Sequence, residues 1–317
     1  MKVPADLLSF FKREKKFFIA THINPDGDAL GSSIALAITL ESMGKKTIPY
    51  CNDPVPEFYK FLPGHERFTN SISDLQPSTF NLVLLDCNEL SRAEVKNTGF
   101  VSSVVIDHHE TETEFGDIKW VNPRSPATGI MVYYLIKELG MKITKEIATN
   151  LYSAIAIDTG TFRYTNTTPE SLRIAAELIE FGADPSYIAE NIYETWSERR
   201  FKLLLKVLST LEISGEVATV LVTQDMLKET GASAEDTENF PGFPRMLKSI
   251  KISALFREIE KDYYKVSLRS KGEKLNVAGI AVTFGGGGHR NAAGYRIRAD
   301  FKKAKEELLK AIYSNCR

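Results

Sequence analysis

Residues 16–30, KFFIATHINPDGDAL, contain the pattern that decides the fold. The apolar run from Lys16 to Thr21 predicts a buried strand, Asn24 to Asp28 predicts a polar turn, and Ala29 to Met43 predicts an amphipathic helix. Strand, polar turn and helix in this order form the unit from which sheets with parallel strands are built. The stretch therefore predicts an α/β domain whose first helix starts beside a group of polar side chains.

The same order of elements recurs farther along the chain. Residues 80–85 and 101–106 are short apolar runs that each lead directly into an aspartate, and they predict two more strands. Residues 129–139 and 147–157 are long enough for helices. We therefore expect an α/β fold with a mostly parallel sheet, and polar residues gathered at the carboxyl ends of its strands, where such sheets bind ligands.

The length of 317 residues favours two cores rather than one. Residues 169–211 are mostly helical in pattern, and the rest of the chain predicts a smaller α/β domain. Its expected strands are residues 216–223, 251–256 and 263–269, and its expected helices are residues 277–283 and 300–313. We divide the chain into a first domain of residues 1–190, a helical linker of residues 191–215 and a second domain of residues 216–317.

The composition indicates a soluble globular protein, with 43% hydrophobic and 26% charged residues. No apolar run approaches the roughly 20 residues that span a bilayer, so no membrane partner is expected. Met1 to Lys16 lacks the pattern of a secretory signal, and the cytoplasm is the expected location. The three scattered cysteines, Cys51, Cys87 and Cys316, match neither a disulfide framework nor a C-x-x-C metal site and are expected to be packing residues.

The net charge of −1 argues against broad electrostatic binding of long DNA or RNA. Such binding requires many lysines and arginines that neutralise successive phosphates. A small anion bound at one local site is compatible with this charge.

Four separate blocks of sequence share one set of metal-binding side chains. They are HINPDGD at residues 22–28, LD at residues 85–86, IDHH at residues 106–109 and AIDTG at residues 156–160. Each block alone has a structural explanation, because an aspartate can cap a helix and a histidine can be a hydrogen-bonded core residue. Together they place several aspartates at the ends of apolar runs, where a carboxylate needs a compensating partner.

Divalent cations would provide that compensation. Asp26, Asp28, Asp86 and Asp158 carry about four negative charges, which two divalent cations would neutralise. The set offers imidazole nitrogen and carboxylate oxygen without thiolate, which suits Mn²⁺, or Mg²⁺ as the alternative, better than a structural zinc cluster. The sequence therefore predicts a two-metal centre.

The run GGGGHRNAAG at residues 285–294 is the strongest local signal in the second half of the chain. Glycines allow close approach of the backbone to an anion, and His289 and Arg290 can add hydrogen-bond donors. The run lacks the Lys-Ser/Thr ending of a Walker loop, and glycines alone also fit a flexible turn. Phosphate binding and a turn both remain explanations of this segment.

The sequence Asp107-His108-His109 resembles the signature of the DHH superfamily of phosphoesterases, and the other blocks match its accompanying motifs in order. The glycine-rich run resembles the GGGH signature of the DHH-associated domain, and residues 265–270 resemble its basic strand. The resemblance covers nearly the whole chain. Within the superfamily, the compact pair of domains is most similar to NrnA-type oligoribonucleases and 3',5'-bisphosphonucleotide phosphatases.

The resemblance implies a set of metal ligands. One ion would be held by His22, Asp26 and Asp86, and the second by Asp28, Asp86, His108 and Asp158, so that Asp86 bridges the two. Asp86, His108 and His109 would be the catalytic residues. Since adjacent residues on an extended chain point to opposite faces, His109 is expected to face substrate phosphate, while Asp107 is expected to be a hydrogen-bond acceptor behind the site.

The resemblance also implies a substrate site in the second domain, formed by Arg269, Gly286, Gly287, Gly288, His289 and Arg290. The roles of Arg163 and Tyr164 stay open. Residues 125–130 lack the serine-rich, acidic helix opening of many such relatives, which affects the expected substrate preference more than the metal chemistry.

The expected function is metal-dependent hydrolysis of short oligoribonucleotides to mononucleotides, with 3'-phosphoadenosine 5'-phosphate as a second candidate substrate. Two alternatives are a phosphodiesterase for linear dinucleotides and a regulatory module that binds nucleotides without catalysis. The expected partners are these short RNAs or nucleotides, and a homodimer is left as an option.

Overall fold

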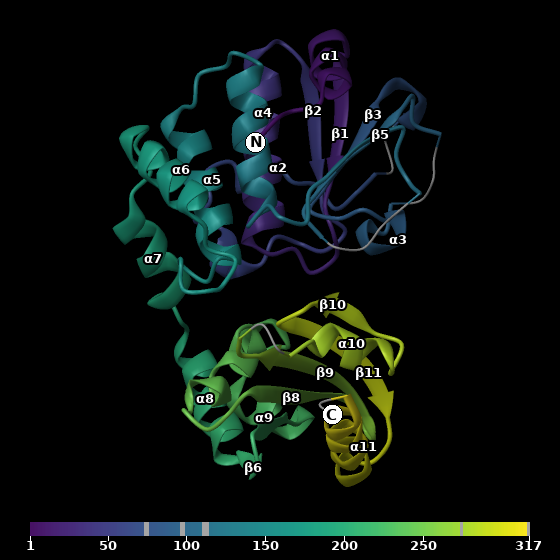
Figure 1. The fold of residues 1–317 in the computed structure, drawn as a ribbon, viewed down its shortest axis with the longest axis vertical. Helices are drawn as coiled ribbons and strands as arrows, with labels where there is room; N and C mark the ends of the chain where they lie inside the picture. Colours follow the sequence, from purple (N-terminus) through teal and green to yellow (C-terminus); the bar gives the residue numbers. More distant parts are fainter. Residues whose placement is uncertain (73–75, 96–98, 110–113, 273–274, 316–317) are drawn as a thin grey trace. The chain divides into compact units, whose positions relative to one another are not determined.

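The computed structural model describes residues 1–72, 76–95, 99–109, 114–272 and 275–315, without the side chains of His289 and Asn315. Cys316 lies outside the described residues. The chain divides into two compact units, Met1–Thr195 and Trp196–Arg317. Figure 1 shows one sheet in each unit, with helices packed against it.

The first unit contains a five-stranded sheet in the order β2-β1-β3-β4-β5. Its strands are β1 (Lys16–Ala20), β2 (Lys46–Tyr50), β3 (Asn81–Leu85), β4 (Ser103–Asp107) and β5 (Ile118–Val121). All four pairs of neighbouring strands are parallel, which confirms the predicted α/β class. The carboxyl ends of β1, β3 and β4 therefore lie next to one another at one edge of the sheet.

Helices of the first unit pack beside its sheet, and α6 and α7 lie farther from the sheet than α2 and α4 (Figure 1). They are α1 (Ala5–Arg13), α2 (Gly27–Ser42), α3 (Leu90–Ala93), α4 (Thr128–Glu138), α5 (Lys145–Asp158), α6 (Pro169–Glu180) and α7 (Pro185–Tyr193). Short 3₁₀ helices occur at Glu57–Tyr59, His65–Arg67 and Pro77–Thr79. The predicted helices at residues 129–139 and 147–157 correspond to α4 and α5.

Helix α2 is buried on nearly all sides rather than amphipathic as expected. It packs against the sheet and also against α4 and α5, because its first two turns carry little side-chain bulk. Gly31 lies so close to α5 that a Cβ atom at this position would be 2.5 Å from the carbonyl oxygen of Asn150. The contact holds the start of α2, with its polar residues, firmly against the helix that ends at Asp158.

Helix α1 contributes two aromatic rings to the main core of the first unit. Phe10 and Phe11 are fully buried and meet Phe17 of β1 at ring-centroid distances of 5.8 and 5.4 Å. Burying each ring stabilises the fold by roughly 1.5–3 kcal/mol. The helix is therefore anchored to β1 through the main core of the first unit.

The second unit contains a mixed six-stranded sheet in the order β10-β11-β9-β8-β7-β6. Its strands are β6 (Glu212–Ser214), β7 (Val217–Val222), β8 (Ile252–Glu260), β9 (Tyr263–Ser270), β10 (Gly287–His289) and β11 (Ala292–Arg298). Only β7 and β8 are parallel neighbours among these described strands. The smaller second α/β domain predicted from the sequence has this sheet at its centre.

The helices of the second unit are α8 (Glu198–Ser209), α9 (Gln224–Thr230), α10 (Val277–Val282) and α11 (Phe301–Asn315). Short 3₁₀ helices occur at Glu235–Thr237, Phe240–Gly242 and Pro244–Met246. Helix α8 occupies much of the predicted linker, residues 191–215, and buries Leu203, Leu204 and Val207 against β7 and Phe240. Among the described helices of both units, none has the length and apolar composition needed to cross a membrane.

The close contact between α2 and α5 predicts that a single methyl group added at Gly31 destabilises the chain. Gly31→Ala forces the two helices apart and should lower the free energy of unfolding by about 1–3 kcal/mol. Urea denaturation of the whole chain measures the change. Gly242→Ala is the matched control, because a Cβ atom there meets nothing within 4 Å. Equal stability of the two variants would show that α2 and α5 are not in tight contact.

Candidate metal centre

Five predicted metal-binding residues meet at the carboxyl edge of the first sheet. His22 and Asp26 follow β1, Asp86 follows β3, and His108 follows β4. Asp158 reaches the same place from the last residue of α5 rather than from a strand. Four segments that are distant in sequence therefore supply ligands to one region, and the parallel order of the strands is the reason.

Asp28 is buried in the first turn of α2, and both of its carboxylate oxygens accept hydrogen bonds. Oδ2 accepts from the backbone amide of Thr128 at 2.7 Å, and Oδ1 accepts from that of Gly129 at 2.8 Å. The Ser32 hydroxyl donates to Oδ1 at 3.0 Å. The amino terminus of α4 thus stabilises the negative charge with two N–H groups and its helix dipole.

Asp26 is the N-cap of α2, and its Oδ1 accepts from the amides of Asp28 and Ala29 at 3.0 Å each. The structural explanation considered for this residue is therefore correct. It does not exclude metal binding, because a carboxylate oxygen of Asp26 also lies close to His22 and Asp86.

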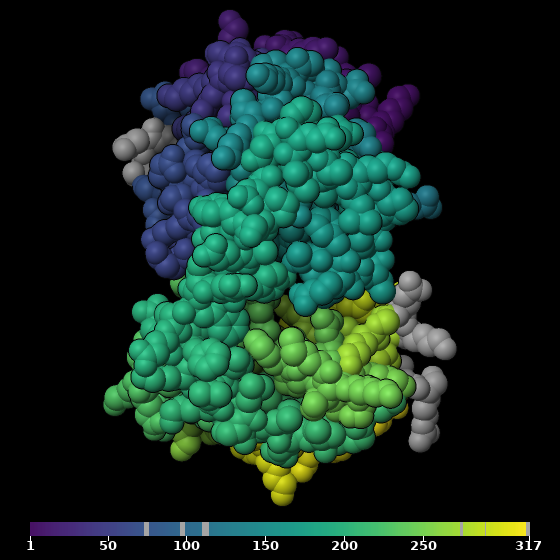
Figure 2. Space-filling view, turned by 90° about the vertical axis from the view of Figure 1, so that its left-hand side faces the viewer, coloured from purple at the N-terminus to yellow at the C-terminus, as the bar shows by residue number. Residues whose placement is uncertain are grey.

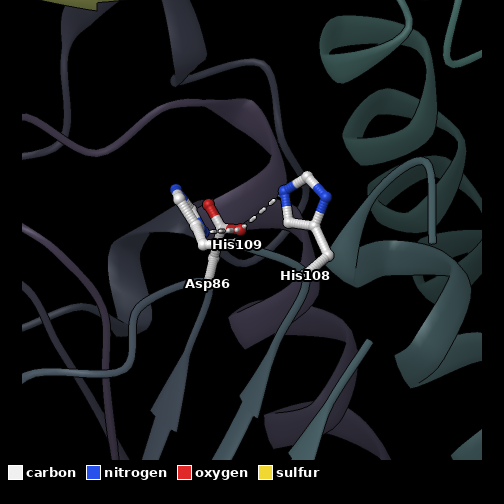
Figure 3. Close-up of side chains that lie close together, drawn as sticks. All are labelled: Asp86, His108 and His109. Atoms are coloured by element: carbon white, nitrogen blue, oxygen red, sulfur yellow. Dashed lines mark ion pairs between the residues drawn. The ribbon is translucent and has the colours of Figure 1, made fainter. Parts of the chain in front are cut away.

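Asp86 lies at the centre of the cluster and is almost completely buried. Its Oδ2 lies 3.4 Å from His22 Nε2, and its Oδ1 lies 3.3 Å from His108 Nε2. Oδ1 also accepts a hydrogen bond from the Thr128 hydroxyl at 2.9 Å. Figure 3 shows the carboxylate between the rings of His108 and His109. Each oxygen of Asp86 thus faces a different histidine, as a bridging ligand requires.

The hydrogen bonds of the two histidines determine which ring nitrogen can bind a metal. His22 Nδ1 lies 2.9 Å from the carbonyl oxygen of Ile23, and His108 Nδ1 lies 3.1 Å from that of Ser125. A carbonyl oxygen only accepts, so each Nδ1 carries the hydrogen atom. In the neutral ring, Nε2 then presents a lone pair toward carboxylate oxygens, which are also acceptors. A cation between such atoms relieves this conflict, so the residues fit a metal centre.

The ligand atoms form three overlapping groups in which all atoms lie within 4.8 Å of one another. The groups are His22 with Asp26 and Asp86, Asp28 with His108 and Asp158, and Asp86 with His108 and His109. Asp86 and His108 each belong to two groups. The arrangement therefore offers two neighbouring positions for a cation, with nitrogen and oxygen ligands at both.

His109 is held by Asp107 behind the cluster. Asp107 is fully buried, and its Oδ1 accepts from the backbone amide and from Nδ1 of His109, at 3.2 and 2.6 Å. Within the described residues, Asp107 Oδ2 has no hydrogen-bond partner. This bond fixes the tautomer and the direction of the imidazole ring of His109.

Burial and mutual repulsion raise the pKa values of two aspartates of the cluster, whereas hydrogen bonds with histidines lower that of a third. Burial, and then the charges of Asp86 and Asp158, hold the pKa of Asp28 well above its usual range. Burial also raises the pKa of Asp158 to about 7, although the charge of His108 opposes this. Burial would raise the pKa of Asp86 as well, but hydrogen bonds with His108 and His22 hold it well below its usual range.

The histidines take up protons to balance these carboxylates. Burial lowers the pKa of His22, but the hydrogen bond with Asp86 and the charges of Asp26 and Asp86 outweigh this and raise it to about 9. The pKa of His108 is likewise raised, since the charges of Asp158, Asp86 and Asp28 outweigh burial. Without a cation, the cluster therefore binds protons in its place.

Three residues that support the ligands are absent from the sequence prediction. Thr128 and Gly129 hold Asp28 and Asp86, and the carbonyl oxygen of Ser125 orients His108. A Cβ atom at Gly129 would lie 2.8 Å from that of Ala154 and 3.4 Å from Asp28 Oδ1. The only signal was a Thr-Gly pair at the start of an apolar helix, which indicates an anion-binding amino terminus only if a buried carboxylate is known to face it.

The predicted substrate residues lie in the second unit. Arg269 is half-buried on β9 and pairs in register with Ala292, next to the turn that contains the exposed Arg290. A Cβ atom at Gly286 or Gly288 would collide with the backbone of β11, so these two glycines are required for close strand packing. A Cβ atom at Gly287 would meet nothing within 4 Å. The side chain of His289 is not among those that the structure describes.

Arg163 and Tyr164 follow a turn in which Gly160, Thr161 and Phe162 all have positive φ angles. Arg163 Nε donates to the carbonyl oxygen of Gly160 at 2.7 Å, and its guanidinium group lies over the ring of Tyr193. These contacts give Arg163 a structural role in the turn that follows Asp158.

Two protein-family models match the chain. The model of the DHH family, N-terminal domain, matches residues 16–155, and the DHHA1 domain model matches residues 215–317. Together the two models span most of both units.

Named proteins resemble the chain over nearly its whole length. The bifunctional oligoribonuclease and PAP phosphatase NrnA of Thermus thermophilus is 38% identical, with 98% of this chain and 93% of that protein covered. The protein of the same name from Bacillus subtilis is 30% identical, with 87% of each covered. The crystal structure of an exopolyphosphatase-related protein from Bacteroides fragilis is 29% identical, with a TM-score of 0.90, and covers 100% of this chain and 98% of that one.

The raised pKa values predict how stability depends on pH when cations are removed with EDTA. His22 has a pKa of about 9 in the folded chain and about 6.5 when unfolded, so its contribution is complete below pH 6.5 and is lost as the pH rises to 9. Urea denaturation should show the free energy of unfolding falling by about 1–3 kcal/mol over this interval. Asp158 adds to the loss only below its pKa of about 7.

Millimolar Mn²⁺ should remove this fall, because a cation binds the deprotonated ring. His22→Asn, which cannot take up the proton, is the control and should make the fall in the EDTA profile smaller, while the contribution of His108 remains. A wild-type profile in EDTA that is level from pH 6.5 to 9 would refute the assigned pKa of His22.

Proposed function

From the chain's place in the DHH family, to which it belongs by both of its domains, we propose that it is a metal-dependent phosphoesterase that hydrolyses short oligoribonucleotides to mononucleotides. The relatives named as bifunctional oligoribonuclease and PAP phosphatase support this substrate class over nearly the full length. The same names support 3'-phosphoadenosine 5'-phosphate as a second substrate. Both reactions break a phosphate ester with water.

One observation carries the proposal. The lone pairs of His22 Nε2 and His108 Nε2 and the oxygens of four aspartates converge in a buried region, with Asp86 shared between both histidines. A purely structural role would require each of these acceptors to find a hydrogen-bond donor. Apolar residues would fill the same space at lower cost, so the cluster is best explained by cation binding.

We assign one cation to His22, Asp26 and Asp86, and a second to Asp28, Asp86, His108 and Asp158. These sets correspond to two of the groups of converging ligand atoms, extended by Asp86 as the shared ligand. Nitrogen and oxygen ligands without thiolate suit Mn²⁺, and Mg²⁺ is the alternative. When bound, the pair of cations lowers the pKa of a water molecule and offsets charge on the phosphate oxygens.

The residues of the chain itself prepare the site for that reaction. The amides of Thr128 and Gly129 hold the carboxylate of Asp28 in place, and the Thr128 hydroxyl orients Asp86. His109, fixed by Asp107 through Nδ1, provides a second ring nitrogen with which to contact phosphate. We assign His109 to the substrate phosphate rather than to a cation, since its Nδ1 is already bound to Asp107 Oδ1 at 2.6 Å.

In the second unit we assign Arg269, Arg290 and His289, with the backbone of Gly286, Gly287 and Gly288, to a phosphate group of the substrate. Gly287 leaves open space at its Cα, so a ligand can approach the backbone there. Arg290 is exposed, and Arg269 is half-buried beside it in the sheet. This arrangement offers cationic donors near a backbone without bulky side chains, which suits an anion.

Product analysis tests the proposed reaction. Purified protein with Mn²⁺ should convert end-labelled RNAs of two and five nucleotides to mononucleotides and should release phosphate from 3'-phosphoadenosine 5'-phosphate. Asp86→Asn removes the shared ligand and should lower kcat/KM by more than about a hundredfold, beyond the loss typical of residues that only orient ligands. Asp225→Asn, at an exposed position on α9, is the matched control and should retain activity.

The outcomes separate the candidate functions. Turnover of the dinucleotide alone would favour a linear-dinucleotide phosphodiesterase. Tight nucleotide binding without any product would refute the enzyme and favour a binding module.

Asp107 supplies a second test that leaves the cation ligands unchanged. Asp107→Asn keeps the size of the side chain but removes the charge that fixes His109, and should lower kcat by about 10–100-fold. The stabilisation by Mn²⁺ should stay the same. In a cycle with His109→Gln, the double variant should be no slower than His109→Gln alone, because Asp107 acts through His109. Additive losses would show that Asp107 has a separate role.

A further inference from the structure

Three cationic side chains lie side by side on one face of the second sheet. Arg257 of β8 is the register partner of Lys265 of β9, and Lys265 is also the register partner of Arg296 of β11. Directly opposite residues of antiparallel strands point to the same face, with Cβ atoms about 4.5–5.5 Å apart. These three residues are called the cation row below. Strand pairing therefore brings together three like charges from separate parts of the sequence.

The cation row is not neutralised by its own chain. In the part of the chain that the structure describes, none of its three members forms an ion pair within 4.0 Å, whereas the nearby Arg298 pairs with Glu260. Burial, and then the neighbouring cations, lower the pKa values of Arg257 and Lys265, and the charge of Glu238 opposes this only in part. Like charges on adjacent strands destabilise a sheet, so the row suits an anion from outside the chain.

The sheet face that carries the row is covered on one side and accessible on the other. On β8 the face is covered, since Leu255 packs against α8, which forms part of the outer surface of the second unit (Figure 2). On β9 and β11 the face is accessible, because Arg296 is exposed and Lys265 and Ser267 are half-buried. A ligand can therefore approach the row along β9 and β11.

Arg269 lies on the same face of β9 as the cation row, four residues beyond Lys265. At the rise of a strand, this places the two positions about 14 Å apart. Between them lie the register partners Leu255, Ser267 and Gly294, which carry no charge. The face therefore offers two cationic positions that are separated by an uncharged strip.

We propose that the cation row binds a second phosphate of an RNA strand whose other phosphate is bound at Arg269. The inference rests on the proposed function, which assigns Arg269 to a substrate phosphate. The two positions are farther apart than two successive phosphates of one strand, so a dinucleotide cannot reach both. RNAs of several nucleotides then gain a contact that dinucleotides lack. The subsite would thus favour the longer of the short substrates.

The uncharged strip is the reason to choose RNA over an inorganic phosphate chain. In RNA, phosphates alternate with ribose units, so an uncharged part of the ligand lies over Ser267 and Gly294. In an inorganic polyphosphate the charge is continuous and part of it would lie over the strip without a cation. The spacing of the two cationic positions therefore matches a nucleotide strand.

Fluorescence anisotropy of the full chain in EDTA, which removes the cations that hydrolysis requires, tests the subsite. The probes are 3'-labelled RNAs of two and five nucleotides with a 5'-phosphate. Lys265→Met keeps the apolar stem but removes the charge, and should raise the Kd of the five-nucleotide RNA by about tenfold and that of the two-nucleotide RNA by less than about twofold. Lys302→Met, at an exposed position on α11, is the matched control and should leave both Kd values unchanged. An equal loss for both RNAs, or no loss for the longer one, overturns the proposal.

The salt dependence identifies the lost contact as one with phosphate. For the five-nucleotide RNA, the slope of log K against log salt should be about 0.7 shallower in Lys265→Met than in the wild type, the value for one phosphate of a single strand. Unlabelled five-nucleotide RNA should displace the probe at a lower concentration than tripolyphosphate does. Stronger displacement by tripolyphosphate would assign the row to inorganic phosphate chains and overturn the RNA subsite. Because hydrolysis is not measured, failure here is distinct from failure of the proposed enzyme function.

Discussion

The metal centre depends on the pair of hydrogen bonds that the amides of Thr128 and Gly129 donate to Asp28, a hundred residues earlier in the chain. A buried carboxylate next to other carboxylates is strongly disfavoured, and the amino terminus of α4 provides the donors and the positive end of a dipole that it needs. This requirement fixes α4 against α2. Because Gly129 and Gly31 both allow close contact with α5, the same packing places Asp158, at the end of α5, beside His108.

The cluster that results is held together by the fold but not neutralised by it. Asp28 and Asp158 retain protons more readily than ordinary aspartates, and His22 and His108 take up protons more readily than ordinary histidines. Protons and divalent cations therefore compete for the same oxygen and Nε2 atoms. It follows that metal affinity and stability are coupled, and that both depend on pH through the same four side chains.

Much of this architecture could be predicted because strands and their polar ends leave a local signal. A short apolar run followed by an aspartate indicates both a strand and its carboxyl end, as for β3 and β4. Helix α1, with its two buried phenylalanines, and the edge strands β2 and β5 were not predicted, because short segments at the margin of a sheet have weak periodicity. Thr128, Gly129 and Ser125 act largely through backbone groups, and side-chain chemistry in the sequence cannot reveal such a role.

The net charge of the chain likewise does not show how its charges are distributed between the two units. In the first unit the aspartates of the centre are concentrated, while in the second unit Arg257, Lys265 and Arg296 lie side by side on three adjacent strands. Burial and then the charge of Arg257 lower the pKa of Lys265, so these cations repel one another. A total of −1 is therefore the sum of two regions of opposite sign. The total argues against broad binding of long polyanions, but local affinity for phosphate depends on strand register, which brings together cations that are distant in the sequence.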